Sequence, residues 1–371
     1  MVQVQPLAMQ ADHSYNQYGT EEPLFEYGDV TYSARYLDKA LLAAGTTRRS
    51  LLRSDWQSRL TRGPYIMGGT LSAYGAAVAC YYPFANHVGV GIHTGAMKLM
   101  SAFHLARNIE GFEGAIFGPG DEYDLQVLQQ QLHDALSING YSSNRFTMFD
   151  TELYLHFFVV HDYQYLCRLV DAGLSLGVVA PTGKKRSPFD PASVPAGGDG
   201  RWGCYVEGNL DAILKQDLHA GLLVRVQKRL PNTSLQRMPV GDEPTMFGAI
   251  VGPARVNPGL TYIVSPYAMF EHLRDGFGLY LGYSITKHHQ DYWTDERCDQ
   301  SVPVKLNVLQ EQSVWAAERV LVGIFYDLDL GSREYRFNPI ISANLEIPVA
   351  WVMAERSAIT YGLSLGVEMH F

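Results

Sequence analysis

The last twelve residues of the chain, Thr360-Tyr-Gly-Leu-Ser-Leu-Gly-Val-Glu-Met-His-Phe371, alternate between two kinds of side chain. One parity is small or polar, and the other is apolar throughout: Tyr361, Leu363, Leu365, Val367, Met369 and Phe371. Successive side chains of a strand point to opposite faces, so the pattern predicts a strand with one wholly apolar face. Strands of a membrane-spanning β-barrel have this character, because one face meets lipid and the other meets a polar lumen.

The same alternation recurs along most of the chain. It is clear in 146–160, 201–215, 218–229 and 341–351, and noisier in 87–105, 166–180, 260–272, 277–288 and 319–328. These segments are longer than ordinary strands and suit the roughly 9–11 residues that a strand needs to cross a bilayer. Charged residues make up only 18% of the chain, and the 23 tyrosines and 35 glycines suit membrane-interface girdles and tight turns.

The lengths of the connections predict the orientation. Bacterial barrels have short periplasmic turns and long outer loops. Counting back from Phe371, 354–357 is an outer turn, and beyond it long connections at 108–145, 183–200, 230–258 and 290–313 alternate with short ones at 85–87, 161–165, 216–218, 273–276 and 329–334, provided that 238–256 is loop and not strand. An even count needs a further strand, and 24–33 is the best upstream candidate. We therefore expect an all-β fold, a transmembrane antiparallel up-and-down barrel of about twelve strands over 24–371, with 34–65 as another outer loop and 1–23 as an N-terminal extension.

Helices enter the prediction in two ways. Residues 63–97 contain no charged side chain, so a membrane-spanning helix is an alternative there. The glycines and Pro83 in that stretch, and the turn-like 84–87, favour a hairpin of two strands instead. Amphipathic patterns over 35–44 and 121–138 predict short helices in the outer loops, with apolar faces that must be buried against something.

The C-terminus also resembles a known signal. Bacterial outer-membrane barrels end in a polar–any–Gly–any–any–apolar–any–aromatic pattern, and Ser364, Gly366, Met369 and Phe371 fill its four defined positions. The resemblance implies an exported outer-membrane β-barrel of a Gram-negative-type cell, with the barrel-assembly machinery as a partner. The start of the sequence, Met-Val-Gln-Val-Gln-Pro-Leu-Ala-Met-Gln-Ala, lacks the pattern of a signal peptide, so export is expected from the C-terminus alone.

Enzymatic, metal and nucleic-acid functions find little support. The net charge of −9 argues against a nucleic-acid partner, and the four cysteines show no metal or disulfide spacing, so we expect them unpaired and expect no cofactor. The pattern Gly-x-Ser-x-Gly occurs at 173–177 and 362–366, but both copies fall within predicted strands, whereas a nucleophile elbow needs a strand–turn–helix. The His-x-Ser and Asn-Gly motif of outer-membrane phospholipases is missing. We therefore predict that the protein is not an enzyme.

Charge clusters in the outer loops leave alternatives open. Asp121, Glu122 and Asp124, or Asp295, Glu296 and Asp299, could bind calcium, although charged solvated loops explain both groups more simply. Residues 184–186, Lys-Lys-Arg, could likewise contact lipopolysaccharide, which we expect, with outer-membrane lipid, as a partner.

The inward parity predicts which side chains line the lumen. It assigns to the lumen Asp150, Glu152, His156, Asp171, Glu207, Asp211, Lys215, Arg225, Arg229, Glu271, Arg319 and Glu346. Rings of charge set the ion preference of a pore. This mixed but acidic set predicts a porin-like passive channel for small polar solutes or ions, weakly cation-preferring, with a homo-oligomer as its candidate assembly.

Two alternatives remain. One is a structural or adhesive barrel sealed by its loops, and the other is a transporter of hydrophobic compounds, suggested by inward aromatics such as Tyr154 and Tyr267. Small inward residues on 70–82 and 87–97, among them Gly75 and Gly91, predict a smooth wall against which a loop helix or the apolar loop 230–257 folds.

Overall fold

The structure is a computed structural model of the 371-residue chain. It describes residues 1–24, 34–45, 65–107, 127, 130–131, 133–163, 168–215, 217–274, 276–328 and 338–370.

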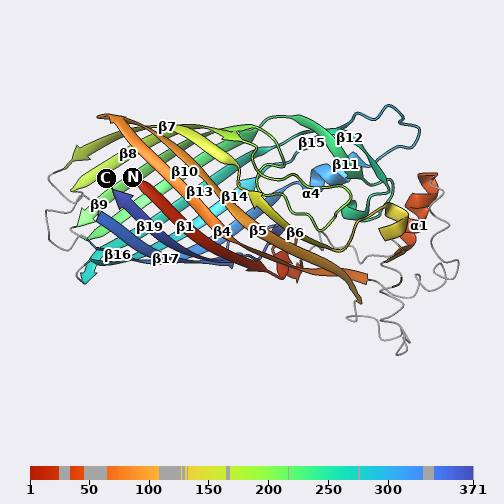
Figure 1. The fold of residues 1–371 in the computed structure, drawn as a ribbon, viewed down its shortest axis with the longest axis horizontal. Coiled ribbons are helices and arrows are strands. Elements are labelled where there is room, and N and C mark those ends of the chain that lie inside the picture. Colours follow the sequence, from red (N-terminus) through yellow and green to blue (C-terminus); the bar gives the residue numbers. More distant parts are fainter. Residues whose placement is uncertain are drawn as a thin grey trace.

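A single antiparallel sheet closes on itself to form a barrel (Figure 1). Its strands are β1 (Val2–Ala11), β4 (Tyr65–Ala85), β5 (Val88–Arg107), β6 (Ser142–Met148), β7 (Thr151–Asp162), β8 (Leu169–Ala180), β9 (Gly203–Lys215), β10 (Leu218–Arg229), β13 (Leu260–Arg274), β14 (Phe277–His288), β16 (Trp315–Asp327), β17 (Asn338–Val349) and β19 (Tyr361–His370). Both β6 and β7 pair with β5, so together they make one wall strand and the wall has twelve. Pairing of β4 with β1 on one side and β5 on the other closes the ring. The predicted fold class is therefore confirmed.

The first strand of the wall differs from the prediction. It is Val2–Ala11, which pairs with β19 and β4, so residues 1–23 are not an extension outside the barrel. The predicted strand 24–33 does not complete the wall, and 25–33 lies outside the described residues. The alternation that predicts a membrane strand is weak in β1, because two of its outward-facing residues are Pro6 and Gln10. Proline is rare in paired strands.

The wall has an apolar exterior. Outward side chains of the mid-strand positions are about half exposed in the isolated chain, among them Leu155, Leu176, Val206, Leu222, Val224, Leu345, Leu363 and Leu365. Aromatic side chains lie toward the strand ends, such as Tyr82 and Tyr326 at one end and Trp202 and Tyr361 at the other. This belt with aromatic margins is the lipid-facing surface of a transmembrane barrel.

The two ends of the barrel differ as the loop lengths predicted. Both termini lie at the end with the short turns, and the long connections gather at the opposite end (Figure 1). Outside the wall, β11 (Asn232–Met238), β12 (Ile250–Asn257) and β15 (Tyr292–Asp295) form a small sheet, and β2 (His13–Tyr15), β3 (Glu21–Pro23) and β18 (Ser357–Ala358) form another. Thus the predicted loop 230–258 is largely a hairpin above the wall.

Short helices occupy the same end. They are α1 (Ala34–Ala43), which is followed by Gly45 with a φ of 65°, the 3-10 helix η2 (Thr245–Phe247) and α4 (Leu306–Gln312). The predicted helix 121–138 is helical at the described residues 127, 130–131 and 133–136, whereas 121–126 lies outside the described residues. None of the described helices is long and apolar enough to span a membrane. The alternative helix over 63–97 is wrong, because these residues belong to β4 and β5.

Candidate functional site: the lumen and its outer mouth

The predicted lumen residues lie on the inward face wherever the structure describes them. Asp150 lies just before β7, and the inward parity of the wall carries Glu152, His156, Asp171, Glu207, Asp211, Arg225, Arg229, Glu271, Arg319 and Glu346. The side chain of Lys215 lies outside the described part of the chain. Of the assembly-signal residues, Ser364 and Gly366 face inward, Met369 faces outward, and Phe371 is not described.

Arg225 is the centre of the mid-lumen network. Its guanidinium donates two hydrogen bonds to the Glu152 carboxylate, at 3.0 and 2.6 Å, and a third to Gln227 Oε1 at 3.1 Å. The Glu207 carboxylate lies 3.6 Å from the guanidinium, which also stacks 3.6 Å from the centre of the Tyr205 ring. One arginine thus faces two carboxylates across strands β7 to β10, so this group has a net negative charge.

A second group lies on the same wall, nearer the short turns. Asp211 accepts a hydrogen bond of 2.6 Å from the Tyr267 hydroxyl and contacts His219 Nδ1 at 3.2 Å. The other ring nitrogen of His219 lies 3.2 Å from Glu271. Asp171 pairs directly across from Asp211 in the sheet, and its buried Oδ1 has no hydrogen-bond partner among the described residues. Two carboxylates therefore contact His219, and a third, Asp171, lies beside Asp211.

The far side of the lumen is less charged. Arg319 Nη1 donates to Glu346 at 3.2 Å, and Gln5 donates to the Ser364 hydroxyl at 2.7 Å. The inward positions in the middle of β17 and β19 are small or polar, namely Ser342, Asn344, Gly362 and Gly366, and Ile340 with Glu368 follows toward the short turns. The predicted charge pairs thus lie along neighbouring strands, with most of the carboxylates on the β7–β13 side.

Inward aromatic rings cover inward glycines of adjacent strands. A Cβ added to Gly91 would lie 2.1 Å from the Tyr154 ring, and one added to Gly177 would lie 2.3 Å from the Tyr205 ring. Gly221 has the same relation to Tyr267, which stacks on Tyr280 with ring centres 5.6 Å apart. The bulky groups at Gly75 and Gly91 are therefore Met97 and Tyr154 of the wall itself, and not the loop that the sequence suggested.

The outer loops do enter the mouth of the barrel. The 183–200 loop packs Val194 and Ala196 against inward residues of β4 and β5: Ala73, Met97 and Leu99. Phe247 of the 230–258 loop is fully buried and meets Phe103 of β5 with ring centres 5.8 Å apart. These contacts bury part of the apolar loop 230–257 identified in the sequence. They also narrow the outer mouth on the β4–β5 side.

Asp150 holds the 183–200 loop in this inward position. Its carboxylate, which is 7% exposed, accepts hydrogen bonds from the backbone N–H groups of Gly183 at 3.1 Å and Gly198 at 2.7 Å. Arg229 Nη1 completes the group, donating to Asp150 at 2.7 Å and to the Arg201 carbonyl at 2.9 Å. Both ends of the loop are therefore attached to one lumen carboxylate.

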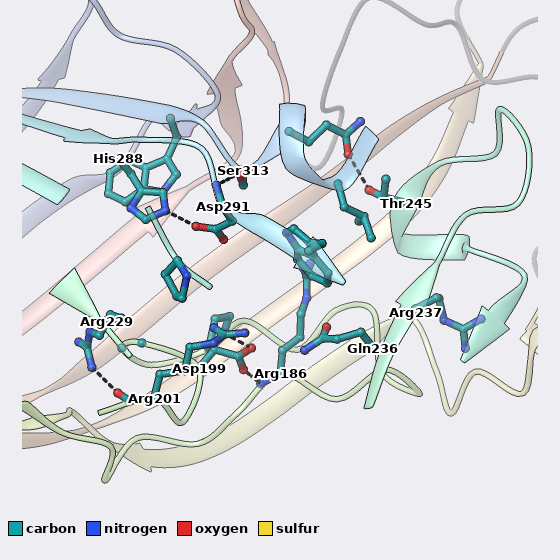
Figure 2. Close-up of a pocket in the computed structure, with 18 of the residues that line it drawn as sticks. Arg186, Asp199, Arg201, Arg229, Gln236, Arg237, Thr245, His288, Asp291 and Ser313 are labelled. Carbon is teal, nitrogen blue, oxygen red and sulfur yellow. Dashed lines mark hydrogen bonds and ion pairs between the residues drawn. The ribbon is translucent and has the colours of Figure 1, made fainter. Parts of the chain in front are cut away.

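A cavity of about 560 Å³ remains at the outer mouth (Figure 2). Its lining comes from the 183–200 loop, the outer ends of β10, β13, β14 and β16, and the small outer sheet. Gln227 lies in this lining and also accepts a hydrogen bond from Arg225. The cavity therefore meets the mid-lumen network directly. Sequence reasoning missed it, because Arg201, Arg237 and Trp293 are far apart in the chain and only the loop packing brings them together.

Arg237 joins three loops at this end. It is buried and donates to the carbonyl oxygens of Pro188, Gly248 and Leu136, at 2.9, 2.8 and 3.0 Å. Burial lowers the pKa of Arg237 to about 10, so the group remains charged at neutral pH. Its hydrogen bonds give these three carbonyl oxygens a donor, but the carbonyls do not neutralise the positive charge of the guanidinium.

The alternative chemistries are poorly supported by the contacts. Ser175 contacts His156 Nδ1 at 2.9 Å, yet no hydrogen bond joins His156 to a carboxylate within the described chain, and both Gly-x-Ser-x-Gly copies lie within wall strands. No group of metal-binding side chains occurs among the described residues. Asp295 pairs instead with Arg297 at 2.7 Å, a contact that lowers its pKa. Cys80, Cys204 and Cys298 are free, as predicted, and Cys167 is not described.

Comparisons with known proteins agree with this fold. No protein-family model and no curated protein matches the sequence. An outer membrane channel from Pseudomonas putida F1 superposes with a TM-score of 0.50 at 10% identity, covering 99% of this chain and 95% of the other. The NanC porin gives a TM-score of 0.33 at 11% identity, covering 83% and 99%. The Salmonella typhi outer membrane phospholipase, an enzyme, gives 0.27 at 10%, covering 99% and 90%.

The fold, the apolar belt and the polar interior define the class of this protein. It is an integral outer-membrane β-barrel of twelve antiparallel strands, similar in architecture to known outer membrane channels.

Proposed function

We propose that the protein is a passive channel for small polar solutes or ions and has no enzymatic activity. The observation that carries the proposal is the continuity of polar groups along the lumen. The outer cavity contacts Gln227, Gln227 contacts Arg225, and the Asp211–His219–Glu271 group lies beyond toward the short turns. Such a lining supplies hydrogen-bonding partners to a hydrated solute at each depth.

We further propose a weak cation preference. In the middle and lower lumen, the carboxylates of Glu152, Glu207, Asp171, Asp211 and Glu271 share one arginine, Arg225, and two histidines. This excess of carboxylates over cationic groups favours cations over anions in the part of the pathway below the outer cavity.

Single-channel recording tests both parts. We expect the folded, detergent-purified protein to give steady conductance steps in planar bilayers, with a reversal potential that favours cations under a salt gradient. Glu207→Gln should shift that potential toward zero, whereas Asp242→Asn, an exposed loop change with the same charge difference, should leave it unchanged. Silence from protein shown to be folded contradicts the channel. An unchanged potential in Glu207→Gln contradicts the lumen as its selectivity filter.

A sealed barrel is the second candidate. The apolar contacts of Phe247, Val194 and Ala196 at the outer mouth favour it, because they occupy space that an open pore leaves to water. A transporter of hydrophobic compounds has less support. The described wall strands pair on both sides around the ring apart from the segment β6, which pairs with β5 alone, and inward tyrosines contact glycines of adjacent strands, which leaves little free apolar surface in the lumen.

A further inference from the structure

The outer cavity is cationic although the chain as a whole carries a net charge of −9. Five arginines line it, Arg186, Arg201, Arg229, Arg237 and Arg356, against two aspartates, Asp199 and Asp291. The arginines come from the 183–200 loop, the residues between it and β9, β10, β11 and the 350–358 turn, so the concentration of charge is produced by the tertiary fold. A concave site with this charge attracts anions.

Not all of this positive charge is neutralised within the site. The guanidinium of Arg201 lies 3.5 Å from Asp199, and Arg229 is held by Asp150. Arg237 contacts only carbonyl oxygens, and Arg356 donates to Gln17. Figure 2 shows Arg186, Asp199 and Arg201 on one side of the pocket and His288 with Asp291 on the other.

Two buried donors at the cavity have no acceptor in the described part of the protein. They are Nε of Arg201, a residue only 9% exposed, and Nε1 of Trp293. A buried donor without an acceptor destabilises the fold. Both donors belong to residues lining the same space, so an oxygen-bearing ligand that reaches this part of the wall would supply the acceptor that each lacks.

The cavity also has a flat aromatic side. The ring of His288 stacks on Trp315 with centres 5.7 Å apart, and its Nε2 is held by Asp291 at 2.9 Å. Both rings line the pocket beside Trp293. At about 560 Å³ the space is large enough for a ligand of several ring atoms.

From these features we propose that the outer cavity is a binding site for a carboxylate-bearing solute of about the size of a sugar acid. Arginine suits this ligand because its planar guanidinium matches the two oxygens of a carboxylate. The Arg201 side and Trp293 Nε1 hold the carboxylate, and the indole and imidazole rings contact the body of the solute. The carboxylates on the short-turn side of Gln227 repel an anion, so the bound solute stays at the outer mouth.

Calorimetry on the folded protein in detergent tests the site with three sugars of the same ring size. We expect glucuronate to bind at least tenfold more tightly than neutral glucose, and glucosamine, a cation, to bind no better than glucose. Trp293→Phe, which keeps an aromatic ring but removes the donor, and Arg201→Gln should each weaken glucuronate binding about tenfold. Arg255→Gln changes an exposed arginine of β12 that does not line the cavity, so it is the matched control and should bind as the wild type does.

The outcomes are separable from those of the channel experiment, because binding in detergent does not require conduction. Equal affinities for glucuronate and glucose, or wild-type affinity in Trp293→Phe shown to be folded, overturn the site. Binding together with silent bilayers leaves the site in place and removes only the pore.

Discussion

At the scale of single residues, the lumen depends on close contacts between glycines and aromatic rings. Gly177 allows Tyr205 to lie against β8, and the outer face of that ring carries the Arg225 guanidinium, which in turn holds Glu152. The absence of one side chain therefore positions a charged group two strands away. The same relation at Gly91 and Tyr154 shows that it is a repeated way of filling this barrel.

Gly177→Ala should destabilise the barrel by about 1–3 kcal/mol, because the new Cβ would lie 2.3 Å from the Tyr205 ring and force it to move. The measurement is urea unfolding in detergent followed by tryptophan fluorescence. Gly208→Ala is the control: it lies on the neighbouring strand, and its added Cβ has no atom nearer than 3.9 Å. Equal stabilities of the two variants would show that the ring does not need the glycine.

At the scale of elements, the 183–200 loop is the part that adjusts the outer mouth. Its apolar residues rest on β4 and β5, and its two ends are attached to Asp150. The loop also supplies Arg186 to the cavity, and Arg201 follows directly after it. One carboxylate thus holds a loop that lies at the mouth and also lines the cationic site.

Asp150→Ala should release this loop, because two backbone N–H groups and Arg229 lose their acceptor together. We expect a larger and noisier single-channel conductance, with the wall still folded. Arg145→Gln removes a different attachment, the ion pair with Asp190 at 2.6 Å in the middle of the loop, and should have a smaller effect. A conductance of Asp150→Ala identical to the wild type would mean that the loop does not restrict the pathway.

Elements also show where sequence reasoning succeeds. The alternation of apolar and polar residues predicted eleven of the wall strands and their inward faces. It could do so because each side chain of a barrel strand meets either lipid or lumen, so apolar and polar residues separate by parity. It failed for β1, where Pro6 and Gln10 stand on the lipid side and pairing with β4 and β19 decides the structure. It could not find the outer cavity either, since Arg201, Arg237 and Trp293 converge only through loop packing.

At the scale of the whole molecule, the barrel separates two environments across a single layer of backbone. Leu222 and Leu223 are adjacent in β10, yet Leu222 is 39% exposed on the lipid side while Leu223 faces the lumen opposite Ser265. A charge at the bilayer midplane costs about 2–4 kcal/mol on the lipid face, and far less where water is present. We therefore expect Leu222→Arg to impair folding into membranes, and Leu223→Arg to fold.

The reversal potential of Leu223→Arg under a salt gradient tests most directly whether ions pass through this lumen. The new cation would lie on the inward face of β10, two residues from Arg225. If the lumen is the pathway, the variant conducts and its reversal potential moves toward anions relative to the wild type. If folded wild-type protein is silent, or if the variant keeps the wild-type potential, ions do not pass through this lumen.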